Sequence, residues 1–69
     1  MAYYLRVPYR DSNNITVMAT FGRPLLNALT ANIKAQDLSF KRKQAVEVVD
    51  QHLNLQAVFR EGYRVWRLG

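Results

Sequence analysis

Cysteine is absent from this 69-residue chain, so disulfides, thiol nucleophiles, iron–sulfur clusters and cysteine-based zinc sites are excluded. Small secreted domains usually need such cross-links, which favours a reducing, cytoplasmic location. No run approaches the roughly 20 apolar residues of a membrane-spanning helix, and residues 1–6 lack the basic and then apolar plan of a signal peptide. We therefore expect a cytoplasmic protein without a membrane segment.

Catalytic groups are also few, because the chain has one histidine and five acids. The acids lack the spacing of a paired-carboxylate or metal site and are scattered at Asp11, Asp37, Glu47, Asp50 and Glu61. His52 is interpreted as a structural or surface residue, and the glycines are isolated rather than gathered in a phosphate-binding loop. We expect no enzymatic activity, no metal, no cofactor and no small-molecule substrate.

The remaining composition is that of an ordinary folded domain, with 49% hydrophobic and 22% charged residues. No repeat, low-complexity tract or linker interrupts residues 1–69, so the whole chain is assigned to one domain. Lysine and arginine total 10 against 5 acids, which gives a net charge of +5 and a pI near 10.1. This charge favours an anionic partner.

Two strands are predicted in the first third of the chain. Residues 3–10 alternate apolar and polar side chains, the pattern of a strand with one buried face, and Pro8 indicates an edge or an unpaired side there. Residues 11–14 are turn formers, and residues 15–21 alternate again with β-branched side chains. The two segments are expected to pair as an antiparallel hairpin.

Two short helices are predicted in the middle. Pro24 suits the first position of a helix that ends near residue 35 or 36. Its apolar stripe, spaced as in a helix, is Leu25, Leu26, Leu29 and Ile33. Asp37 or Ser39 can cap a second helix. The buried face of that second helix is Ala45, Val46, Val49 and Leu53.

A second hairpin is predicted at the end of the chain, where residues 55–60 and 63–68 flank Glu61-Gly62. A two-residue loop pairs Arg60 with Tyr63, Val58 with Val65, and Gln56 with Arg67, and it places Trp66 in the core. A three-residue loop would instead bury Tyr63 and Val65 and expose Trp66. The two-residue register is preferred because burying Trp66 is a more favourable distribution of apolar area between core and surface than burying Tyr63 and Val65 and exposing Trp66.

The predicted segments follow the order ββααββ. The simplest arrangement is an α+β fold, a four-stranded antiparallel sheet with two helices packed on one face. In an alternative, the second helix is a recognition helix and the last hairpin is a wing, and residues 24–68 then resemble the helix–helix–hairpin half of a winged-helix domain. That resemblance uses no specific motif, and two strands replace the expected leading helix.

The uncovered face of the predicted sheet interleaves arginines with tyrosines. Arginine offers phosphate a planar donor fork, and tyrosine offers a ring on which a base can stack. Phosphate contacts are assigned to Arg6, Arg10, Arg60, Arg64 and Arg67. Stacking is assigned to Tyr4 and Tyr63. The alternative interpretation is that these residues form only the solvated face of a two-layer domain.

A second basic cluster, Lys41-Arg42-Lys43, falls in the first turn of the second predicted helix. Free backbone N–H groups and three cations would together form an anion-binding helix end. The alternative is an ordinary solvated helix start, with the Arg42 stem lying over the apolar stripe. If the helices cover the opposite face of the sheet, this cluster and the sheet arginines cannot both contact one short straight strand.

The sequence thus predicts a small, basic, non-enzymatic nucleic-acid-binding protein and leaves DNA and RNA open. The alternative is a protein–protein interaction module, a small regulator or inhibitor of a host protein, that uses the exposed sheet face. That face carries more apolar area than a solvated face needs, through Tyr4, Met18, Val58, Tyr63 and Val65. A homodimer is expected, because so short a chain has a small core.

Overall fold

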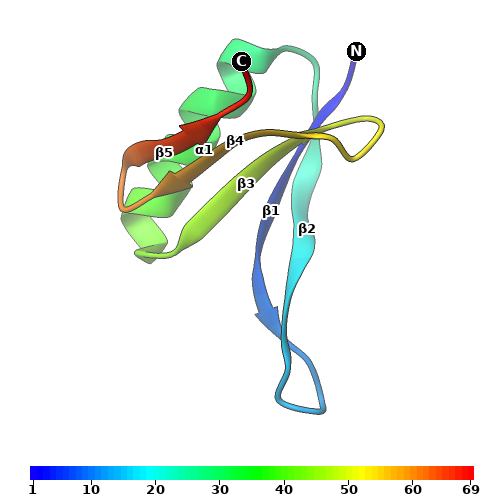
Figure 1. The fold of residues 1–69 in the computed structure, drawn as a ribbon, viewed down its shortest axis with the longest axis vertical. Coiled ribbons are helices and arrows are strands. Elements are labelled where there is room, and N and C mark those ends of the chain that lie inside the picture. Colours follow the sequence, from blue (N-terminus) through cyan, green and yellow to red (C-terminus); the bar gives the residue numbers. More distant parts are fainter.

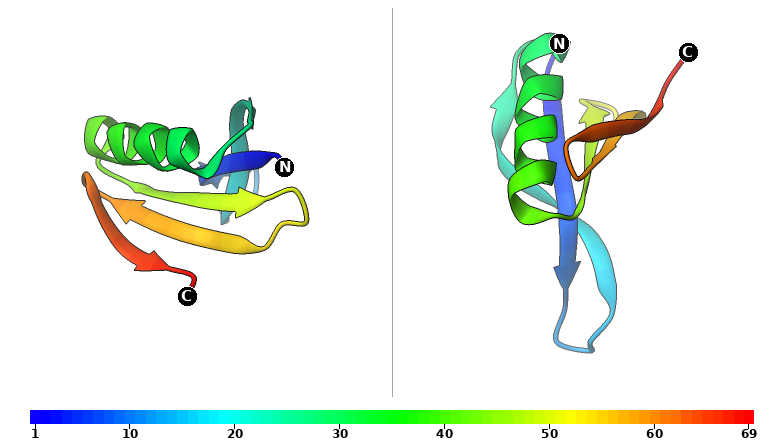
Figure 2. Two further views of the ribbon diagram at one scale, coloured as in Figure 1. Left: turned by 90° about the horizontal axis from the view of Figure 1, so that it is seen from above. Right: turned by 90° about the vertical axis from the view of Figure 1, so that its left-hand side faces the viewer.

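The computed structural model describes all 69 residues, which form one antiparallel sheet covered on one face by one helix (Figure 1). The elements are β1 (Tyr3–Arg10), β2 (Thr16–Leu25), α1 (Ala28–Arg42), β3 (Ala45–Asp50), β4 (Leu55–Arg60) and β5 (Tyr63–Arg67). The five strands lie in the order β2-β1-β3-β4-β5. The helix connects β2 to β3 and lies over the sheet (Figure 2). No helix of this fold has the length and apolar character needed to cross a membrane.

The expected fold of four strands and two helices is wrong, because the second predicted helix is strand β3. Of the residues assigned to its buried helical face, Ala45, Val46 and Val49 belong to the strand, whereas Leu53 lies in the loop after it and is 65% exposed. Val46 and Val48 point into the core, and Glu47 between them pairs with Arg6 on the other face, so the real period is two. The valine content of this segment favours a strand. The winged-helix alternative fails for the same reason, since it needs two helices.

Helix α1 continues through the point where a break is predicted. It starts after Asn27, whose side chain accepts a hydrogen bond from the Thr30 N–H at 2.8 Å, whereas Pro24 belongs to β2. Asp37, expected as a cap, lies inside the helix and pairs with Lys41 one turn later. Neither proline nor glycine occurs between residues 27 and 42, so nothing in that segment stops the helix.

The core lies between α1 and the sheet. Its members are Leu5, Val7, Ala31, Ala35, Val46, Val48, Ala57 and Phe59. The helix contributes only the two alanines, with Ser39 buried one turn further on. The expected buried stripe is therefore wrong, because Leu26, Leu29 and Ile33 are exposed and only Leu25 is partly buried. Small residues on the inner face of α1 match a sheet whose own valines and Phe59 already fill the interface.

The first hairpin is confirmed. Asp11 holds its turn by accepting hydrogen bonds from the N–H groups of Asn13 and Ile15 at 2.9 and 3.0 Å. Strand β3 pairs only with residues 3–6 of β1, so Pro8 has an unpaired side, as predicted. The outer half of the β1–β2 hairpin therefore projects beyond the rest of the sheet (Figure 1).

The second hairpin is confirmed in its turn but not in its full register. Glu61 and Gly62 both have positive φ, as a two-residue hairpin loop requires, and Arg60 pairs with Tyr63. A β-bulge then shifts the register by one residue, so Val58 pairs with Trp66 and Ala57 with Arg67. Val65 and Gln56 therefore lose their predicted partners. Trp66 shares the outer face with Val58 instead of entering the core.

Candidate nucleic-acid interface

One end of the molecule gathers cations from two segments that are distant in the sequence. The helix ends at Lys41 and Arg42, and Lys43 caps it in the left-handed conformation. Two residues later β3 begins at Ala45, which pairs with Arg60 at the end of β4. Figure 2 shows the helix end and the β4–β5 turn on the same side of the molecule. We call Lys41, Arg42, Lys43, Arg60 and the neighbouring Tyr63 the basic end.

The basic cluster of the helix is thus at a C-terminus, and its predicted position at a helix start is wrong. Carbonyl groups, not free N–H groups, point out of this end, so the backbone offers a phosphate no donors. The helix dipole instead favours Lys41 and Arg42 in the last turn. Any anion bound here is held by side chains alone.

Hydrogen bonds between helix and turn fix the geometry of the basic end. The Gly62 N–H donates to Ser39 Oγ at 3.0 Å, and Gln36 Nε2 donates to the Gly62 carbonyl at 2.9 Å. Phe40 covers the same glycine, since a Cβ there would lie 3.2 Å from its ring. These contacts join the β4–β5 turn to the last turns of α1, so Arg60 and Tyr63, which flank the turn, are held near the C-terminal end of the helix.

Only two of the ten lysines and arginines form ion pairs, Arg6 with Glu47 and Lys41 with Asp37. Arg42 is also engaged, because its guanidinium lies 4.8 Å from the centre of the Phe21 ring. Lys43 and Arg60 are exposed and have no acidic partner. They are the two cations of the basic end whose full donor capacity faces solvent.

The middle of the outer sheet face is electrically neutral. Arg6 Nη2 lies 2.7 Å from Glu47 Oε1, and both side chains are largely covered. Its Nε is buried without a hydrogen-bond partner. Tyr4 is half-buried on the same face, opposite the fully buried Val49. Arg6 and Tyr4 are therefore packed into the outer face. Little of the Arg6 guanidinium is accessible to a phosphate, and little of the Tyr4 ring is accessible to a base, although the sequence predicts both contacts.

The other predicted contacts lie apart from this face. Arg10 is at the base of the turn of the projecting β1–β2 hairpin, where it pairs with Thr16. Arg64 and Arg67 pair with Phe59 and Ala57, whose side chains enter the core, so both arginines lie on the helix side of edge strand β5. The predicted single platform is therefore divided between the hairpin, the outer face and the β5 edge.

Trp66 is the aromatic residue that sequence reasoning missed. It lies on the outer face of β5 and is 44% exposed, three residues after Tyr63, which is 75% exposed. The bulge at Val65 puts both rings on one face, because Tyr63 pairs with Arg60 and Trp66 with Val58. A bulge leaves no composition signal here, so the register could not be read from the sequence.

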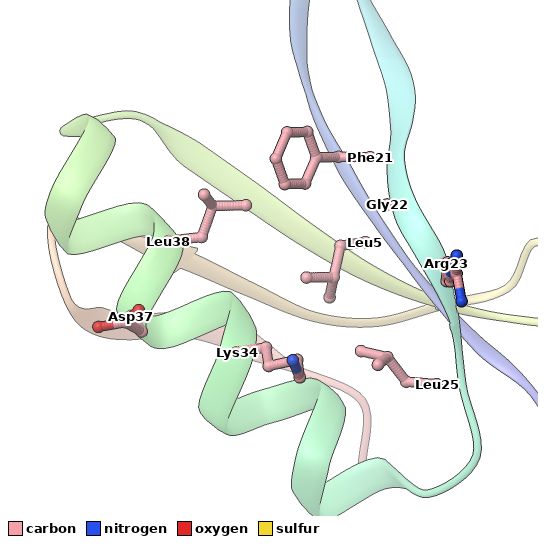
Figure 3. A pocket seen from close by; sticks show the side chains of 8 residues that line it. All are labelled: Leu5, Phe21, Gly22, Arg23, Leu25, Lys34, Asp37 and Leu38. Atoms are coloured by element: carbon pink, nitrogen blue, oxygen red, sulfur yellow. The ribbon is translucent and has the colours of Figure 1, made fainter.

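A groove of about 380 Å³ opens between β2 and α1 (Figure 3). Leu5, Leu25 and Leu38 point into it, and Lys34 and Asp37 lie along its helix side. The β2 side of the groove coincides with a bulge at residues 22–24, where Gly22 has φ +78° and the register with β1 shifts. Asp37 is paired with Lys41, and no three His, Asp or Glu side chains come together as a metal site.

Asp50 orders the loop at the opposite end of β3. Its Oδ1 accepts hydrogen bonds from the N–H groups of His52 at 2.8 Å and Asn54 at 2.9 Å. Gln56 Nε2 donates to Oδ2 at 3.3 Å. These bonds, chiefly the one from the Asn54 backbone, lower the pKa of Asp50 below its ordinary value of 3.8 although burial opposes the shift. The side chain acts as a structural acceptor.

Comparisons with known protein families, curated proteins and solved structures found no match to this chain. A function is therefore inferred from the basic end and from Tyr63 and Trp66 on the outer face of β5.

Proposed function

We propose that this protein is a small, non-enzymatic nucleic-acid-binding protein that contacts phosphates through the basic end. The observation that carries the proposal is that Lys43 and Arg60, both exposed and without acidic partners, lie at the same end of the molecule, because Ala45, two residues after Lys43, pairs with Arg60. Tyr63, the residue paired with Arg60, exposes 75% of its surface. Guanidinium and ammonium groups beside an accessible ring suit phosphate and base together.

Strand β5 supports single-stranded rather than duplex nucleic acid as the preferred ligand. Tyr63 and Trp66 lie on its outer face, while Arg64 and Arg67 lie on its helix side. A strand laid along β5 could stack bases on the two rings and place phosphates near the arginines across the edge. Bases in a duplex are not accessible for stacking on side chains.

The proposal includes a cytoplasmic location and a homodimer. The chain has no cysteine and so does not use the disulfides that stabilise many proteins of oxidising compartments, which supports a cytoplasmic location. Only 11 of the 69 residues are buried, so the monomer has a small core and a second copy would add buried area.

Binding to a labelled single-stranded oligonucleotide at low salt tests this function. The double variant Lys43→Ala/Arg60→Ala should bind about tenfold or more weakly, because two phosphate contacts are lost. The matched control is Arg23→Ala/Lys34→Ala, which removes the same two charges from exposed positions beside the groove between β2 and α1. An equal loss in both variants, or no binding by the natural chain, would contradict the proposal.

A protein–protein module is the second candidate, and the Arg6–Glu47 ion pair favours it. The pair neutralises the centre of the outer face, where Val58 and Trp66 add apolar area. Such a face suits a protein surface better than a phosphate backbone. Retention of one protein partner, insensitive to salt and to nuclease and lost in Trp66→Ala, would support this candidate over nucleic acid.

A further inference from the structure

The outward face of α1 carries the largest apolar side chains of the helix. Leu26 just before the helix, and Leu29, Ile33 and Phe40 within it, expose 83, 71, 58 and 67% of their surfaces. The inward face contributes Ala31, Ala35 and Ser39 to the interior, and Leu38 is partly buried against the core. Most of the large apolar side chains of α1 are thus exposed, whereas the larger apolar residues of a surface helix usually face the core.

The residues within the helix form a regular seam. Leu29, Ile33, Gln36 and Phe40 are separated by four, three and four residues, the spacing with which two helices pack knobs into holes. The seam spans about 17 Å along the helix axis, and Leu26 lies just before it, ahead of the cap residue Asn27. Its one polar member, Gln36, already donates one of its two Nε2 hydrogens to the Gly62 carbonyl, so part of its hydrogen-bonding capacity is satisfied within the chain.

We infer that this seam is the interface of a dimer formed by two copies of the chain across α1. Each of the four exposed apolar side chains offers on the order of 100 Å² of apolar surface. Two copies would then cover roughly 800 Å² in these side chains alone, and flanking residues bring the total to the range of about 1,000 Å² that a specific interface needs.

Two further observations favour a second copy as the occupant. The seam itself is uncharged, and the Asp37–Lys41 pair neutralises part of its flank, so little charge selects an acidic partner. An uncharged seam with a regular repeat is complementary to itself, as an isologous interface requires. Leu5 and Phe59 are the only residues larger than valine in the core cluster of the monomer, so the exposed leucines, Ile33 and Phe40 would add substantially to the buried apolar area.

The seam borders the proposed nucleic-acid site but does not include Lys43 or Arg60. Lys43 follows the last residue of α1, and Arg60 lies on the outer sheet face. The flank of the seam adjoins β5, because Leu29, Ile33 and Gln36 line a groove with Arg64, and Phe40 covers Gly62. The mass of the chain without nucleic acid and the affinity of the Lys43 and Arg60 variants are separate measurements, so either inference can fail while the other holds.

Sedimentation equilibrium of the purified chain without nucleic acid tests the dimer. The natural chain should have a mass of twice 8.0 kDa at micromolar concentration. Ile33→Glu should weaken association by about a hundredfold or more, because each copy would bury an unpaired carboxylate. Ala28→Glu is the control, since it adds the same acid at an exposed position of α1 outside the seam. A monomeric natural chain, or a folded Ile33→Glu variant that stays dimeric, would overturn the inference.

Single-cysteine variants provide a second measurement that does not depend on the stability of an acidic variant. The chain has no cysteine, and Ile33 lies near the middle of the seam, so a cysteine there should meet its counterpart whether the helices run parallel or antiparallel. Ile33→Cys should form a covalent dimer rapidly under mild oxidation, and Lys34→Cys, which lines the groove between β2 and α1 instead, should do so much more slowly. Equal rates for the two variants would overturn the inference.

Discussion

Ser39 Oγ accepts a hydrogen bond from the Gly62 N–H at 3.0 Å and donates one to the Gln36 carbonyl at 2.9 Å. Ser39 is fully buried, so this single hydroxyl joins the helix to the β4–β5 turn that presents Arg60 and Tyr63. The basic end therefore depends on a residue that carries no charge itself.

Replacing Ser39 with alanine should destabilise the fold by about 1–3 kcal/mol, because the Gly62 N–H would be left without its acceptor. Chemical denaturation with urea measures the change. Ser12→Ala, in the exposed β1–β2 turn, is the control and should change stability by less than about 0.5 kcal/mol. Equal stability of both variants would show that the hydroxyl does not hold the turn.

Gly62→Ala should destabilise the chain more than Gly22→Ala. Both glycines have positive φ, at 87° and 78°, so both substitutions impose backbone strain of about 1 kcal/mol or more. A Cβ at Gly62 also meets Phe40 at 3.2 Å, whereas nothing lies within 4 Å of one at Gly22. The difference in unfolding free energy therefore isolates the contact with Phe40, and no difference would place Phe40 away from the turn.

The two hairpins could be predicted because their signals are local. Asp11 and Gly62 act on the backbone within a few residues, and turn chemistry of that kind is readable from the sequence. Strand β3 could not be recognised as easily, because its apolar residues fit both a helical and a strand period. Its β-branched side chains were the signal that separates the two.

The candidate site could be predicted only as a set of residues. The sequence assigns both Lys43 and Arg60 to nucleic acid, but on opposite sides of the fold. Their position at one end of the molecule depends on α1 extending to Arg42 and on β3 following at once to pair with β4. Such pairing is tertiary and leaves no local signal. The neutralisation of Arg6 by Glu47 is likewise a contact across 41 positions of the chain.

Glu47→Ala should lower stability more than it changes nucleic-acid binding. Loss of the 2.7 Å contact leaves the half-buried guanidinium of Arg6 without its acidic partner, which should cost about 1 kcal/mol. A double-mutant cycle with Arg6→Ala measures the coupling. A gain of more than about tenfold in oligonucleotide affinity would show that Arg6, once released, is a major phosphate ligand, contrary to the site described.

Asp50→Asn should destabilise the protein at neutral pH and much less in acid. The pKa of Asp50 is lowered in the fold, so its contribution is complete above the ordinary value of 3.8 and is lost as the pH falls through the lower folded pKa. The difference in stability between the natural chain and the variant should therefore shrink below pH 3.8. Thermal unfolding followed across acid pH measures it, and a constant difference would contradict the hydrogen-bonded carboxylate.

The salt dependence of oligonucleotide binding by Arg60→Ala tests the nucleic-acid site most directly. Each phosphate contact to a single strand contributes about 0.7 to the slope of log affinity against log salt concentration. Arg60→Ala should lower the slope by about that amount relative to the natural chain, and Arg23→Ala, an exposed arginine near the far end of β2, should leave it unchanged. The same slope for the natural chain and Arg60→Ala would contradict a phosphate contact at the basic end.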